Sequence, residues 1–198
     1  MNRIVVYGAT SAGIAAAVQV ARMGCAVVLI EPTARLGGLT TGGLGATDIG
    51  NKAAIGGLAR EFYCRVRKHY RQPAAWRWQR PDEYQSRGQA TTDPDEEAQW
   101  TFEPSAALAI FRELLREHGI AVEYDEPLDR RPGAGVRREG RRIAALVGTS
   151  GREYRGQVFI DATYEGDLMA ASGVSYRVGR EGEAEYSETL AGARRDLD

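Results

Sequence analysis

Cysteine and histidine are scarce in this sequence, and those present show no spacing typical of a metal centre or a disulfide framework. The chain has two cysteines, Cys25 and Cys64, and two histidines, His69 and His118. The cysteines lie far apart, form no CxxC pair and have no metal-like spacing to either histidine. We therefore expect no metal site, and a protein of a reducing, cytoplasmic compartment.

No uncharged apolar run is long enough to predict a membrane span. The most apolar stretch, residues 14–30, is interrupted by Arg22 and Gly24, whereas a span needs about 20 apolar residues. A signal peptide is the alternative, because Arg3 precedes an alanine-rich apolar run. Two glycines near this run are unnecessary for secretion, however, and have the specific use described below.

An excess of charge of either sign is also absent. The chain carries 26 Lys and Arg against 27 Asp and Glu, a net charge of -1. No general attraction to nucleic acid or to an anionic membrane is expected. Three tryptophans with arginines nearby in the sequence could stack on nucleic-acid bases. They are Trp76, Trp78 and Trp100. The charge balance argues against this, and packing against a neighbouring domain explains them better.

The acidic residues Asp161, Glu165 and Asp167 are the one cluster that could suggest a metal. Oxygen cages usually need more ligands and a tighter loop, and carboxylates are also favoured at a helix N-terminus. The sequence shows no Ser-His-Asp arrangement and no credible nucleophile. The catalytic residues therefore stay unknown at this stage.

What the chain does have is a strand–helix–strand unit at its start. Residues 3–7 are a β-branched run typical of a buried strand, and residues 26–30 form a second apolar run. Between them, residues 11–23 are alanine-rich with apolar residues at helical spacing, and Gly24 ends this segment as a C-terminal glycine often does. This order predicts two parallel strands joined by a crossover helix.

The glycines of this unit have the spacing of a dinucleotide-binding turn. Gly8 allows a tight turn after the first strand, and Gly13 lets the helix lie close to the sheet. The N–H groups near Ser11 and Ala12 would then face a pyrophosphate. Glu31 ends the second strand, where a carboxylate can accept hydrogen bonds from both ribose hydroxyls.

Thr10 departs from the GxGxxG pattern, which has glycine at that position. A side chain there crowds the approach of the pyrophosphate, but threonine is small and its hydroxyl could donate to a phosphate oxygen. The motif alone is a weak signal, and the strand, helix, strand and acidic residue around it strengthen it. A glycine turn in another kind of α/β domain is the structural alternative.

The segment behind Glu31 favours FAD over NAD. An NAD enzyme usually enters a second helix here, whereas this chain continues through a glycine- and threonine-rich loop, residues 32–57. Such a loop lets the backbone run beside an extended pyrophosphate and ribityl chain, although its composition also fits a plain flexible loop. The cofactor-binding residues expected in this loop are Pro32, Arg35, Gly37, Gly38, Thr40, Thr41, Gly42 and Gly43.

The rest of the chain alternates between helices and strands. Residues 71–100 are polar and poor in aliphatic side chains, and we interpret them as an insertion or mobile loop. The other elements expected are helices at about 58–70, 103–118 and 166–172, a third strand at 120–124, and a hairpin of 143–148 with 153–159 around Ser150-Gly151.

Four stretches of the sequence resemble a known family of FAD-dependent oxidoreductases. This family has a GxTxAGIAAA start and an EPxxxLGG loop, and threonine at the position of Thr10 is usual within it. The resemblance covers most of the chain outside residues 71–100. Its stretches are residues 6–17, 29–48, 102–115 and 158–173, followed by weaker matches at 178–181 and 186–188.

The resemblance implies an α/β fold of the FAD/NAD(P)-binding Rossmann type, with a parallel sheet, helices and a crossover β-hairpin at 143–159. It also implies that Leu128 offers backbone to the adenine, and that Ala162, Thr163 and Gly166 line the adenosine side. The expected FAD-binding domain comprises residues 1–70 and 101–173. Residues 174–198 would begin a further, substrate-side region.

The function that follows is transfer of a hydride from a small organic substrate to FAD. The alternatives are a non-catalytic dinucleotide-binding module or remnant and, third, an NAD-dependent dehydrogenase; rings, sugars and polyols all remain open as substrates. No nucleic acid or membrane partner is expected. We expect these 198 residues to be an N-terminal portion of a larger protein or a truncated gene product, so that alone they bind FAD weakly with little turnover. The alternative is that a partner chain completes the pocket.

Overall fold

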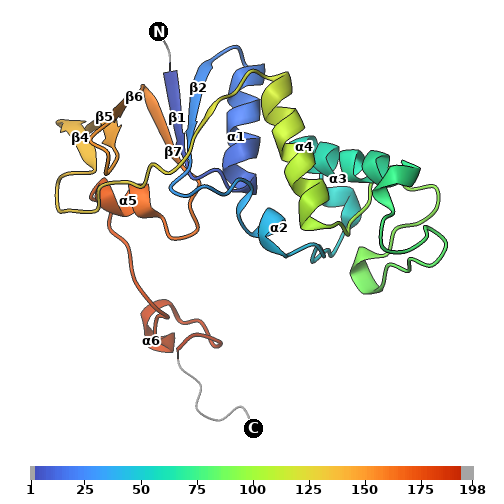
Figure 1. Ribbon diagram of the computed structural model, residues 1–198. Coiled ribbons are helices and arrows are strands. Elements are labelled where there is room, and N and C mark those ends of the chain that lie inside the picture. Colours follow the sequence, from blue (N-terminus) through green and yellow to red (C-terminus); the bar gives the residue numbers. More distant parts are fainter. Residues whose placement is uncertain (1–2, 193–198) are drawn as a thin grey trace.

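A four-stranded parallel sheet forms the centre of the computed structural model, which describes residues 3–192 (Figure 1). Its strands, in the spatial order β3-β2-β1-β7, are β3 (Val122–Glu123), β2 (Ala26–Ile30), β1 (Arg3–Tyr7) and β7 (Val158–Asp161). Tyr7 pairs with Ile30 on one side and with Asp161 on the other. The carboxyl ends of these strands therefore meet at one edge of the sheet.

One helix, α1 (Ser11–Arg22), packs directly on one face of the sheet, and α3 (Gly57–Tyr70) and α4 (Pro104–Glu117) pack beside it on the same side (Figure 1). Apolar residues of these helices and of β1 and β2 form one buried cluster. Within it the rings of Phe62 and Phe111 stack with centroids 4.9 Å apart. The predicted helices are confirmed, and Gly24 follows α1 with φ of +74°, a left-handed conformation that favours glycine.

A three-stranded antiparallel meander lies on the other side of the sheet, with strand order β4 (Val136–Glu139), β5 (Arg142–Val147) and β6 (Glu153–Arg155). The short helix α5 (Asp167–Ala171) also lies on this side. Tyr7, Leu128, Leu146 and Tyr154 are buried between the two sheets. The sheet is therefore covered on both faces, as a parallel sheet requires.

The predicted hairpin is right in its turn and wrong in its extent. β5 and β6 pair across Ser150-Gly151, but Val158 and Phe159 belong to β7 of the parallel sheet. The meander also has a third strand, β4. The sequence did not predict it, because three of its four residues are exposed and charged and give no apolar pattern. The third parallel strand is shorter than the predicted 120–124, since only Val122–Glu123 pair with β2.

The long glycine-rich segment after β2 contains helical turns that the sequence did not predict. The five-residue helix α2 (Gly38–Gly42) is flanked by Gly37 and Gly43, both with positive φ. A 3-10 turn, η1 (Lys52–Ala54), follows it. Part of the expected loop is therefore a short helix, and a glycine with positive φ stands at each of its ends.

Residues 71–100 have the irregular backbone expected of an insertion or loop, and the end of this segment packs against the body. They contain the 3-10 turns η2 (Pro73–Ala75) and η3 (Gly88–Ala90). Ala98 and Trp100 are fully buried in a small separate core with Ile49, against Tyr63 and Cys64 of α3.

Beyond Gly173 the described chain extends away from the body and contains one four-residue helix, α6 (Glu183–Tyr186) (Figure 1). No further helix was expected here. The two glutamates in its first turn, Glu183 and Glu185, are favoured at a helix N-terminus. Residues 193–198 of the predicted substrate-side region lie outside the described residues. No helix within residues 3–192 has the length and apolar character needed to cross a membrane.

Candidate functional site

A cleft of about 1000 Å³, which we call the edge cleft, lies at the carboxyl edge of the parallel sheet. The turn after β1, the loop after β2 and the turn after β7 form its walls, with additional side chains from α4 and the end of β3. Ligands of open α/β sheets bind at this edge. Its lining residues are Thr10, Glu31–Leu36, Gly38, Leu39, Thr41, Gly42, Leu108, Arg112, Tyr124, Thr163, Tyr164, Glu165 and Asp167.

Gly8 and Gly13 shape the turn after β1 because neither position has room for a side chain. Gly8 has φ of +96°, and a Cβ there would lie 2.9 Å from the Ala162 carbonyl carbon. A Cβ on Gly13 would lie 1.9 Å from the Gly8 carbonyl oxygen. The two glycines thus bring the start of α1 against the turn after β7, as the motif predicts.

Thr10 closes this turn with its side chain. Its hydroxyl donates to the Ala162 carbonyl oxygen at 2.8 Å and accepts from the Gly13 N–H at 3.3 Å, as the N-cap of α1. A hydroxyl has one proton to donate. The predicted donation from Thr10 to a phosphate would therefore require the bond to Ala162 to break.

Glu31 is 7 % exposed at the end of β2 and lines the edge cleft. One carboxylate oxygen accepts from the Ala9 N–H at 2.8 Å. The other accepts from the N–H of Thr33 at 2.9 Å and from its hydroxyl at 2.7 Å. A carboxylate has about four acceptor sites, so three are filled and about one remains. Glu31 can accept one ribose hydroxyl without losing a bond, rather than the two that the sequence suggested.

The loop after Glu31 is anchored to the glycine turn. The Gly37 N–H donates to the Ala9 carbonyl at 2.8 Å, and Gly37 has φ of +94°. Gly38 packs so closely on Tyr164 that a Cβ there would lie 2.2 Å from its hydroxyl oxygen. This hydroxyl accepts from the Leu39 N–H at 2.7 Å. Gly37 and Gly38 therefore let the loop pack closely against the turn after β1 and against the turn after β7.

The turn after β7 repeats the arrangement at Glu31. Asp161 accepts from the N–H and hydroxyl of Thr163 at 3.0 and 2.7 Å, and from the Met169 N–H of α5 at 2.8 Å. Gly166, with φ of +70°, donates its N–H to the Thr163 hydroxyl. The acidic residues here support a helix start, and no group of His, Cys, Asp and Glu side chains within residues 3–192 has a metal-binding arrangement.

Arg112 of α4 and Tyr124 just after β3 are among the cleft residues that the sequence did not predict. Burial raises the pKa of the Tyr124 hydroxyl; the positive charge of Arg112 opposes this shift and the negative charge of Glu31 adds to it. These residues come from distant parts of the chain. The only available signal was an aromatic residue directly after the third strand.

Some predicted site residues lie outside the lining of the edge cleft. Ser11, Ala12 and Thr40 line an adjacent apolar cavity of about 310 Å³ among the helices. Leu128 is buried in the core between the sheets, and its N–H donates to the Tyr7 hydroxyl at 2.8 Å. Gly43 ends α2. Pro32, Arg35, Gly38, Thr41 and Gly42 do line the cleft, together with Thr10, Glu31 and Thr163.

Comparison with solved structures gives one alignment with a TM-score above 0.5, and this alignment supports the description of the fold. The chain aligns with L-proline dehydrogenase from P. horikoshii at a TM-score of 0.51 and 16% identity, covering 91% of this chain and 58% of that one. It also aligns with a mutant flavin monooxygenase from Stenotrophomonas maltophilia at a TM-score of 0.45 and 15% identity, covering 81% and 38%. The chain thus spans less than two thirds of the length of these structures.

Comparison with protein families gives the identity. No curated protein matches the sequence. The family described as "FAD dependent oxidoreductase" matches residues 3–196, which is nearly the whole chain. This result agrees with the glycine turn, the acidic residue that ends β2 and the parallel sheet. The chain therefore belongs to the FAD-dependent oxidoreductase family, whose cofactor is FAD.

Proposed function

We propose that the edge cleft holds the ADP half of FAD and that the protein oxidises a small organic substrate. The observation that carries this proposal is the meeting of three turns, after β1, β2 and β7, around one cleft that contains a buried carboxylate with an acceptor site to spare. When bound, FAD supplies a ring that accepts a hydride. The protein supplies binding, orientation and electrostatics.

The residues of the cleft fit an adenosine diphosphate group. The remaining acceptor site of Glu31 suits a ribose hydroxyl, and a bond to a charged acceptor is stronger than a neutral one. Gly8, Gly13 and Gly38 let the turns that form the cleft pack closely against one another. Arg35 and Arg112 line the same cleft and supply positive charge for a pyrophosphate.

The proposal also includes further polypeptide that covers the cleft, either from a longer chain or from a partner chain. Leu39, at the cleft, and Leu44, near it, are 52% and 61% exposed. A redox reaction needs walls that exclude water from the reacting ring. We further propose a cytoplasmic location, because both cysteines are free thiols and such thiols fit a reducing compartment.

The experiment is to load the purified chain with FAD or with NAD, remove the free nucleotide, denature the protein and chromatograph the supernatant. We expect FAD, in a less than stoichiometric amount because the chain alone holds it weakly, and no NAD. Addition of a candidate substrate without oxygen should bleach the visible flavin spectrum of the loaded protein slowly or not at all until the covering polypeptide is supplied. Release of NAD alone, or of no nucleotide after saturation, would contradict the proposal.

A further inference from the structure

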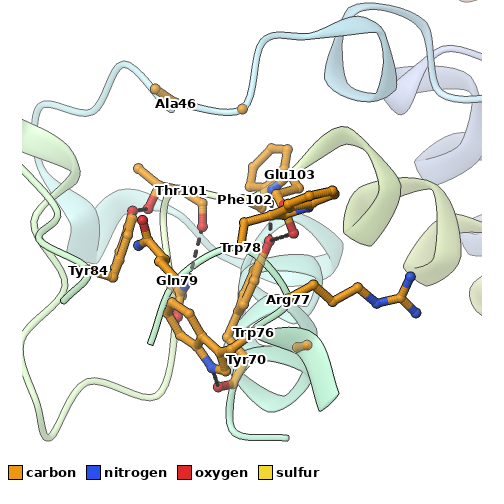
Figure 2. Close-up of a pocket in the computed structure, with 13 residues that line it drawn as sticks. Ala46, Tyr70, Trp76, Arg77, Trp78, Gln79, Tyr84, Thr101, Phe102 and Glu103 are labelled. Atoms are coloured by element: carbon orange, nitrogen blue, oxygen red, sulfur yellow. Dashed lines mark hydrogen bonds between the residues drawn. The ribbon is translucent and has the colours of Figure 1, made fainter. Parts of the chain in front are cut away.

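A second pocket, of about 310 Å³, lies between residues 70–84 and the start of α4, and Figure 2 shows it. We call it the aromatic pocket, because Tyr70, Trp76, Tyr84 and Phe102 line it. The Trp76 ring centroid lies 5.4 Å from that of Tyr70 and 5.7 Å from that of Tyr84. The Trp76 indole N–H donates to the Tyr70 carbonyl at 2.7 Å. The walls are therefore held in place by hydrogen bonds as well as by ring contacts.

Trp78 also lines this pocket, yet it is 88% exposed. Large aromatic side chains usually bury most of their surface. The hydrogen bonds within residues 3–192 leave the Trp78 indole N–H without an acceptor, whereas those of Trp76 and Trp100 are both used. An indole left in solvent beside a pocket is available to contact a ligand.

Glu103 gives the aromatic pocket a negative charge. Its carboxylate accepts from the Tyr70 hydroxyl at 3.2 Å, and the same hydroxyl accepts from the Glu103 N–H at 2.8 Å. Burial raises the pKa of Tyr70 to about 12, so this hydroxyl stays neutral. Glu103 is the N-cap residue of α4, where the helix dipole favours an anion.

No ion pair within residues 3–192 neutralises Glu103, since the ion pairs of α4 involve Glu113 and Glu117 instead. Arg77 also lines the aromatic pocket, but Figure 2 shows its guanidinium directed away from the other lining side chains. The pocket therefore combines aromatic faces with one carboxylate that has no ion-pair partner within residues 3–192. Aromatic faces attract cations.

The aromatic pocket is joined to the edge cleft by a short piece of backbone. Gly42 lines the edge cleft, whereas Gly45 and Ala46 line the aromatic pocket. The Phe102 N–H donates to the Gly45 carbonyl at 2.8 Å, and a Cβ on Gly45 would lie 2.1 Å from the Phe102 oxygen. The segment that leaves the cleft is therefore fixed to the wall of the pocket.

We propose that the aromatic pocket binds a small organic cation, an alkylammonium or quaternary ammonium group, as the substrate or part of it. The assignment as substrate rests on the proposed function, whereas the binding itself does not. Aromatic rings also stack on sugars, but a neutral sugar would leave the Glu103 carboxylate without a counter-charge. A cation would be attracted to the aromatic faces and would also supply the counter-charge for the Glu103 carboxylate.

The test compares choline with its neutral isostere, in which carbon replaces the ammonium nitrogen. Each is titrated into the full chain without FAD, by calorimetry and by tryptophan fluorescence. We expect saturable binding of choline and much weaker binding of the isostere. Glu103→Gln should weaken choline binding by about tenfold or more, which is 1.4 kcal/mol, while Glu113→Gln on the same helix should not change it.

Trp78→Leu supplies a second variant, since an exposed residue can be replaced without loss of the fold. It should weaken choline binding by about two- to fivefold, the range of an exposed cation–π contact. Equal binding of choline and its isostere, or full affinity in folded Glu103→Gln, would overturn the inference. FAD binding without choline binding contradicts only this inference, and choline binding without FAD binding contradicts only the proposed function.

Discussion

Among single residues, Glu31 is the one that the proposed function connects most directly with both folding and cofactor binding. Its carboxylate joins the glycine turn to the loop after β2 through the N–H groups of Ala9 and Thr33. Glu31 also lines the edge cleft, and about one of its acceptor sites is unfilled. A change at Glu31 should therefore lower both the stability of the protein and its affinity for FAD.

We expect Glu31→Gln to lower the free energy of unfolding by about 1.5–3 kcal/mol, the range of bonds to a charged group. FAD affinity should fall by roughly ten- to a hundredfold. Urea unfolding measures the first effect, and a fluorescence titration with FAD measures the second. Thr33→Val is the matched control, because it removes one bond to Glu31 and keeps the carboxylate. It should cost about 1 kcal/mol with little change in affinity; a Glu31→Gln protein with unchanged FAD affinity would assign Glu31 a purely structural role.

Gly13→Ala tests the close approach of α1 to the glycine turn. The new Cβ would lie 1.9 Å from the Gly8 carbonyl oxygen, and this backbone atom cannot move without opening the turn. We expect a loss of about 4 kcal/mol or more in stability, measured by urea unfolding. Gly50→Ala, whose Cβ meets no atom within 4 Å, should change stability by less than about 0.5 kcal/mol. Equal stability of the two variants would mean that the close approach is not required.

The sequence indicated these glycines and Glu31 because backbone sterics and charge restrict which residue types such positions accept. It did not show that the Thr10 proton is used by Ala162, or that three acceptor sites of Glu31 are filled. These partners depend on contacts between separate turns. Arg112 and Tyr124 were missed for the same reason.

At the scale of elements, a few buried apolar residues hold the long segment 71–100 against the rest of the protein. Trp100 is fully buried, and its indole N–H donates to Glu96 at 2.7 Å. Ala98 and Ala90 fill the remaining space around it. A single tryptophan with two alanines leaves no apolar periodicity, so the polar composition dominated the prediction. Strand β4 was missed for a similar reason, since its exposed residues are charged.

Trp100→Ala should lower the free energy of unfolding by about 3–5 kcal/mol, because it removes a buried aromatic side chain and leaves a cavity. Trp78→Ala, at an exposed tryptophan of the same segment, should change it by less than about 0.5 kcal/mol. Urea unfolding followed by circular dichroism measures both. A small effect of Trp100→Ala would mean that the segment 71–100 does not contribute to the cooperative core.

At the scale of the whole molecule, the proposed function depends on three turns that are distant in the sequence and adjacent at one sheet edge. The apolar runs and the crossover rule predicted the parallel pair β1 and β2. The position of β7 beside β1 brings Ala162 and Thr163 to the glycine turn. The sequence did not predict this pairing, because no local pattern specifies which strand pairs with β1; the family resemblance implied only that Ala162 and Thr163 line the adenosine side.

The most direct test of the central claim asks which half of FAD the chain binds. FAD is bound to the full chain and then displaced, in separate titrations, with ADP and with FMN. If the edge cleft holds the ADP half, ADP should displace FAD completely and FMN should not, and Glu31→Gln should weaken ADP binding in parallel with FAD binding. Displacement by FMN, with no effect of ADP, would contradict the account.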